Sequence, residues 1–132
     1  MLLDSLTLEE KKAFWNIANV LSAADGRVDE ELSILKQYSE EMGVEFAFVD
    51  PASVDVAAEL NSIKAGTLKE RKIVYFELFG VAYADTGCSS KEQDILDMAA
   101  SVLEITDDVR TTLEGCVQGI FDSYRRLGDV LA

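Results

Sequence analysis

Histidine is absent from this chain of 132 residues, and cysteine occurs only twice. Without histidine the chain cannot form a Ser-His or Cys-His catalytic pair, use a histidine general base, or build a zinc site that contains His. Cys88 and Cys116 are too few for a disulfide framework or a thiolate metal cluster. We therefore expect both cysteines to be reduced, small buried residues that react slowly with thiol reagents.

Long apolar runs are also absent. No stretch reaches the roughly 18 uncharged apolar residues of a membrane-spanning helix. The first residues, Met1-Leu2-Leu3-Asp4, lack the basic region of a secretory signal peptide. Together with the reduced cysteines, these features predict a cytoplasmic protein that is not an integral membrane protein.

Basic residues are scarce relative to acidic ones. The chain has 12 Lys and Arg against 25 Asp and Glu, which gives a formal net charge of −13. This charge repels phosphate backbones, so we expect no nucleic-acid partner. It attracts metal cations or a basic protein surface instead, although an acidic surface that only keeps the protein soluble is an equally simple interpretation.

Proline occurs once, and 48% of the residues are hydrophobic, which argues against disorder. The length fits one domain covering residues 1–132. Apolar residues recur at helical spacing, for example at Phe14, Ile17 and Leu21. Capping boxes precede two such segments, at residues 7–10 and 67–70. No segment shows sustained alternation, so the sequence predicts a compact all-α bundle of about six to seven helices.

Two of the expected helices carry specific predictions. Residues 73–84 are apolar nearly all round, which is typical of a helix at the centre of a bundle. A buried strand is the alternative, but the flanking caps and the length favour a helix. We expect Ile73, Phe76, Gly80 and Val81 to be inaccessible to solvent there. The last helix follows Thr106, and its predicted core face consists of Val109, Leu113, Cys116, Val117, Ile120, Phe121 and Tyr124.

One short motif occurs twice, about sixty residues apart. Its copies are Ala24-Asp25-Gly26-Arg27-Val28-Asp29-Glu30-Glu31 and Ala84-Asp85-Thr86-Gly87-Cys88-Ser89-Ser90-Lys91-Glu92. Each copy reads as the end of an apolar helix, a turn with Gly, and the start of a new helix, with Asp29 and Ser90 as expected N-caps. The recurrence predicts two helix-loop-helix repeats.

The first copy invites comparison with an EF-hand calcium loop. That loop needs oxygen ligands at its first and third positions, Gly at the sixth and Glu at the twelfth. With Gly26 at the sixth position, the other three are Leu21, Ala23 and Leu32, which are hydrocarbons. The motif is therefore not an EF-hand.

Two interpretations of the motif remain open. In the first, its polar residues only stop one helix and cap the next. In the second, an approximate two-fold arrangement brings Asp25, Glu31, Asp85 and Glu92 together as a metal site. Clustered carboxylates without nitrogen or thiolate ligands suit a hard divalent cation such as Ca²⁺, Mg²⁺ or Mn²⁺.

Two copies of Ala-Asp-Gly-x-Val-Asp-x-Glu in an all-helical chain resemble the TerB-like domain family, and the likeness extends over residues 7–124. That family occurs in tellurite-resistance proteins and at the N-terminus of some membrane-associated DnaJ-type co-chaperones. The resemblance implies a bundle of about seven helices whose acidic clusters bind metal, with the family's acidic positions falling on Asp25, Glu31, Asp85 and Glu92. The second copy departs from the pattern, because Thr86 is inserted and Lys91 stands where an acid is common.

These observations predict a non-enzymatic cytoplasmic TerB-like module that binds a divalent cation, a protein partner or both, in a tellurite-resistance or stress-response context. The alternative is a metal-free acidic helical scaffold that docks a basic partner. A hydrolase that uses carboxylates and a divalent metal is a third hypothesis, supported only by the abundance of Asp and Glu. The sequence predicts no particular oligomeric state.

Overall fold

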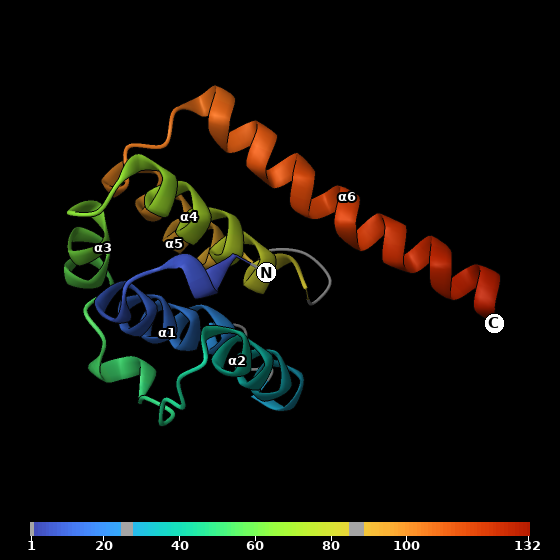
Figure 1. Ribbon diagram of the computed structural model, residues 1–132, viewed down its shortest axis with the longest axis horizontal. Coiled ribbons are helices and arrows are strands. Elements are labelled where there is room, and N and C mark those ends of the chain that lie inside the picture. The colour runs from blue at the N-terminus through green and yellow to red at the C-terminus, as the bar shows by residue number, and fades with distance from the viewer. Residues whose placement is uncertain (1, 25–27, 85–88) are drawn as a thin grey trace.

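The computed structural model describes residues 2–24, 28–84 and 89–132, and for residues 28–32 it describes the backbone alone. These residues form six α-helices and two short 3-10 helices and contain no strand (Figure 1), which confirms the predicted all-α class. In chain order the elements are η1 (Leu3–Ser5), α1 (Leu8–Ala23), α2 (Val28–Met42), η2 (Pro51–Ser53), α3 (Val56–Lys64), α4 (Leu68–Tyr83), α5 (Ser90–Val102) and α6 (Asp107–Leu131).

Helices α1 and α4 form the centre of the bundle. They pack against each other, α2 and α3 also contact α1, and α5 and α6 contact α4. Both central helices start at the predicted capping boxes, in which Thr7 pairs with Glu10 and Thr67 pairs with Glu70. Helix α2 ends before Gly43, whose φ of +70° is the left-handed conformation that glycine adopts at little cost.

The buried residues largely match the predicted core. Phe14, Ile17 and Leu21 of α1 are completely inaccessible to solvent. In α4, burial extends nearly all round the helix, as its composition predicted. The prediction is wrong for Phe76, which is only partly buried because it lies on the side of α4 where a groove opens.

The segment between α2 and α3 contains no α-helix, but Trp15 of α1 holds it against the bundle. The indole Nε1 donates a hydrogen bond to Ala47 O over 2.9 Å. The Trp15 ring also contacts the rings of Phe46 and Phe48, with centroid distances of 5.7 Å each. The loop is therefore anchored by the most voluminous buried side chain of α1.

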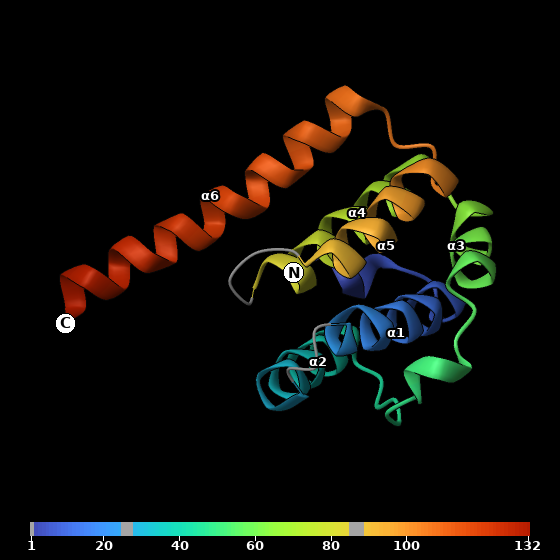
Figure 2. The same cartoon turned by 180° about the vertical axis from the view of Figure 1, so that it is seen from behind.

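Helix α6 departs most from the prediction. Figures 1 and 2 show it running diagonally along α4, with its C-terminal half continuing past the other helices. Of the predicted core face only Val117 is buried, whereas Tyr124 is 67% exposed and Cys116 is exposed. The periodicity correctly predicted an amphipathic helix, but the bundle covers only the first half of its apolar face. Cys116 is therefore not an inert buried thiol.

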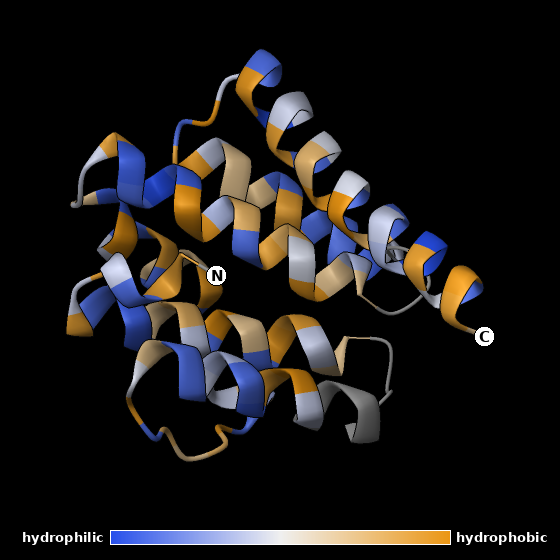
Figure 3. Ribbon diagram, turned by 45° about the vertical axis from the view of Figure 1, so that its right-hand side comes forward, coloured by the Kyte–Doolittle hydropathy of each residue, from blue (hydrophilic) through white to orange (hydrophobic). Residues whose placement is uncertain are grey.

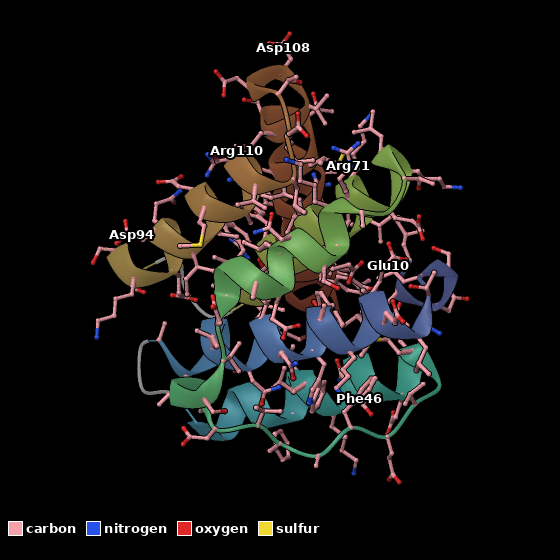
Figure 4. All side chains as sticks on the ribbon, turned by 90° about the vertical axis from the view of Figure 1, so that its left-hand side faces the viewer. Glu10, Phe46, Arg71, Asp94, Asp108 and Arg110 are labelled. Atoms are coloured by element: carbon pink, nitrogen blue, oxygen red, sulfur yellow. The ribbon has the colours of Figure 1, made fainter. Side chains whose placement is uncertain are left out.

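The first half of α6 is fixed to the bundle by Tyr75 of α4. Its hydroxyl donates to Glu114 Oε2 and accepts a hydrogen bond of 2.7 Å from Arg110 Nε. Arg110 also pairs with Asp97 of α5 at 2.6 Å, so one guanidinium joins three helices (Figure 4). Phe121 packs on the ring of Tyr83, about two turns further along α4.

Candidate functional site

The predicted acidic site lies mostly outside the described residues. Asp25 and Asp85 fall in the two undescribed segments, and Glu31 lies in the first turn of α2, where only the backbone is described. Glu92 is described and is 1% exposed. The convergence of the four carboxylates therefore stays a prediction, as does the inward position of Cys88. Within the described residues no group of three or more His, Cys, Asp and Glu side chains is placed to hold a metal ion.

Glu92 has a well-defined structural role. Its Oε1 accepts the Ser89 N–H over 2.9 Å, and Ser89 Oγ accepts the Glu92 N–H over 3.2 Å. This is a capping box, so the N-cap of α5 is Ser89 and the prediction of Ser90 is wrong. Asp29 is not an N-cap either, because α2 begins at Val28. The spacing of Ser89 and Glu92 is a capping-box signal that the sequence already contained.

A groove between α2, α4 and α6 is the most site-like hollow among the described residues. It has a volume of about 360 Å³. Its lining is mostly apolar and includes Ile34 of α2, Phe76 and Gly80 of α4, and Ile120 and Phe121 of α6. A partly apolar hollow with a few convergent polar groups is the usual form of a binding site.

The polar groups in this groove are acidic or neutral. Its described lining contains Glu41, Glu77, Gln37 and Tyr38, and no Lys or Arg. Glu77 is 4% exposed, and burial raises the pKa of its carboxyl group, although the charge of the N-terminal ammonium and a hydrogen bond from the Leu2 N–H oppose this rise. Burial also raises the pKa of the Tyr38 hydroxyl, and the nearby Glu77 charge adds to that effect. The groove therefore combines apolar walls with the carboxyl groups of Glu41 and Glu77.

A second acidic pair lies where α1 and α4 begin. Glu10 is 5% exposed and lies on α1 on the side turned toward α4 (Figure 4). Its Oε1 accepts the Thr7 N–H, whereas its buried Oε2 receives no donor from another described residue and faces the Glu70 carboxylate. Burial and Glu70 raise the pKa of Glu10, whereas the contact with Glu10 lowers the pKa of Glu70. One proton shared by the two carboxyl groups accounts for this geometry.

Comparison with known proteins adds no relative to this description. No protein-family model, curated protein or solved structure matches the chain. The TerB-like resemblance accordingly remains a prediction from the motif. Within the described residues, no helix has both the length and the apolar character that crossing a membrane requires.

Proposed function

We propose that this protein is a non-enzymatic docking module whose groove between α2, α4 and α6 receives an amphipathic helix of a partner protein, with apolar residues on one face and Lys or Arg beside them. The observation that carries the proposal is the groove itself, which has apolar walls and two glutamates but no basic side chain in its described lining.

The charge of the chain supports a basic partner. The net charge of −13 attracts such a partner from a distance. The apolar walls formed by Ile34, Phe76 and Phe121 then supply the burial that holds the partner. Specificity thus comes from charge, and affinity comes mainly from apolar contact.

The same proposal includes the TerB-like assignment, the two helix-loop-helix repeats and a cytoplasmic role in tellurite resistance or stress response. The repeated motif supports these parts of the proposal. A divalent cation at Asp25, Glu31, Asp85 and Glu92 is compatible with docking, because it would act at the loops rather than in the groove. The capping role of Glu92 leaves fewer oxygens for such an ion.

A set of synthetic helical peptides tests the docking proposal. The first has leucines on one face and lysines beside them, the second replaces each Lys by Glu, and the third keeps Lys but replaces each Leu by Ser. By isothermal titration calorimetry we expect only the first to bind, and its binding should weaken as salt is added. Equal binding of the first and third peptides would mean that the groove is not involved.

Two variants of α2 provide a matched control. Ile34→Glu places a charge on the wall of the groove, whereas Ser33→Glu places the same charge on an exposed neighbouring position outside it. We expect Ile34→Glu to abolish peptide binding and Ser33→Glu to leave it unchanged. Melting curves of both variants show whether each remains folded. Equal effects of the two substitutions would contradict the proposal.

A further inference from the structure

Helix α6 carries a second, more open hollow. We call the described residues that line it the α6 hollow, and they all belong to this one helix: Cys116, Gly119, Ile120, Ser123, Tyr124 and Leu127. Three of the six are small, and they form the floor between the large side chains of Ile120, Tyr124 and Leu127. Figure 3 shows that hydrophobic residues recur along α6 as far as its free end.

No described neighbour within the same chain requires a glycine in this hollow. A Cβ at Gly119 would meet nothing within 4 Å, and its φ is not positive. Gly115, one turn earlier, is equally unconfined. Glycine in the interior of a helix lowers helix stability relative to alanine. Close approach of a second helix is a physical reason for glycine at such a position, because the distance between helix axes depends on side-chain size at the contact.

The spacing of large and small residues makes the α6 hollow complementary to itself. When two copies of α6 run antiparallel about a two-fold axis between residues 121 and 122, residue i faces residue 243 − i of the other copy. Each large residue of the α6 hollow then meets a small one. The pairs are Tyr124 with Gly119, Leu127 with Cys116 and Ile120 with Ser123, and beyond the hollow Leu131 meets Thr112. The two-fold axis makes every pair occur twice, as in an isologous dimer interface.

Charge is also compatible with self-association at this place. The chain as a whole carries −13, so its surface on average repels a second copy. Over residues 112–131, which the paired segments span, three acidic residues (Glu114, Asp122, Asp129) and two basic residues (Arg125, Arg126) leave a net charge of only −1. None of these charges lies in the α6 hollow, and Arg125 is already paired with Asp122 at 3.1 Å.

We propose that the α6 hollow is the interface of a homodimer, in which the α6 helices of two copies pack antiparallel with Tyr124 of each copy seated over Gly119 of the other. The exposure of Tyr124 (67%), Leu127 (50%) and Leu131 (74%) then has a function, since pairing removes these apolar side chains from water. A single helix pair is a small interface, so the association is weak and depends on concentration.

Sedimentation velocity from micromolar to millimolar protein tests the proposal with substitutions that exchange the large and small side chains at positions 119 and 124. Gly119→Leu should abolish the dimer, because the new side chain occupies the place of Tyr124, and the double variant Gly119→Leu, Tyr124→Ala should restore it. The matched control is Gly128→Leu, which also has open space at its Cβ but lies outside the α6 hollow, and it should leave the dimer intact. A wild type that stays monomeric at every concentration, or a dimer unaffected by Gly119→Leu, would overturn the proposal.

A disulfide experiment tests the antiparallel register separately. In a Cys88→Ser background, Leu127→Cys places a thiol opposite Cys116 of the second copy, and mild oxidation should convert most of the protein to a covalent dimer. The two thiols within one chain are eleven residues apart on a rigid helix, which places them too far apart to bond to each other. Asp129→Cys, on the other side of α6, should cross-link no faster than the parent. Equal cross-linking of both variants would exclude this register.

Discussion

Gly66 lies beside the first turns of α1 and α4, and a Cβ there would be 2.3 Å from Glu10 Oε2 and 3.1 Å from Glu70 Oε1. We therefore expect Gly66→Ala to displace Glu10 from its capping box at a cost of about 1–2 kcal/mol of unfolding free energy, measured by urea denaturation. In a Glu10→Ala background the same substitution should cost much less, because the clash is then absent. Equal costs in both backgrounds would show that Glu10 is not the constraint.

The contact between Glu10 and Glu70 makes stability depend on pH in a defined direction. The pKa of Glu10 is raised from its ordinary value of 4.5, so the folded state binds its proton more tightly than the unfolded state does. That contribution is complete below pH 4.5 and is lost as pH rises through the folded pKa. The lowered pKa of Glu70 acts in the opposite sense, because its contribution is present above pH 4.5 and is lost at lower pH.

Glu10→Gln tests this linkage. The amide oxygen can still accept the Thr7 N–H, and the amide nitrogen can donate to Glu70 at every pH. We expect the variant to be more stable than wild type at neutral pH, with the advantage shrinking as pH falls toward 4.5. Denaturation curves at a series of pH values measure it. An advantage that does not change with pH would mean that the two carboxyl groups share no proton.

These residues also show what could be predicted at this scale. The capping boxes of Glu10 and Glu70 follow from three-residue spacings, which are local, and the structure confirms them. The contact between the two glutamates was not predicted, because sixty residues separate them and only the packing of α1 on α4 brings them together. For the same reason, the sequence does not link Gly66 to Glu10.

Among the elements, α4 offers the clearest comparison of a core side with a groove side. Leu78 is completely buried, whereas Phe76 is partly buried and lines the groove. We expect Leu78→Ala to cost about 2–5 kcal/mol of unfolding free energy, and Phe76→Ala to cost less although it removes more atoms. Urea denaturation at neutral pH measures both. A larger cost for Phe76→Ala would mean that the groove is closed in solution.

The helices themselves were largely predictable from periodicity. What periodicity did not predict is which part of the molecule, if any, covers the apolar face of each helix. For α1 and α4, other helices of the same chain cover that face. For α6, the stripe continues beyond the bundle, so the same sequence pattern that predicted burial of Tyr124 instead marks an exposed surface. Periodicity indicates that a face is apolar, but it does not identify the partner.

For the whole molecule, the cation hypothesis gives a test that does not depend on the groove or on α6. If a hard cation binds at the repeated loops, millimolar Ca²⁺, Mg²⁺ or Mn²⁺ should raise the melting temperature of wild type by mass action. Asp25→Asn keeps the oxygen acceptor but removes the charge, so it should lose this increase with little change in the absence of metal. No increase in wild type with any of the three cations would leave the loops a purely structural role.

The arrangement of α6 has a last consequence, which concerns proteolysis. Its first half is fixed by the Tyr75, Arg110 and Glu114 contacts, and Phe121 and Arg125 contact Tyr83, whereas the turns that follow the adjacent trypsin sites Arg125 and Arg126 extend past the other helices. Because proteases cut segments that open locally, limited trypsin treatment of dilute protein should first remove the last few residues. At high concentration a second copy would cover the same segment, so the rate of this first cut becomes a measure of how many molecules are paired.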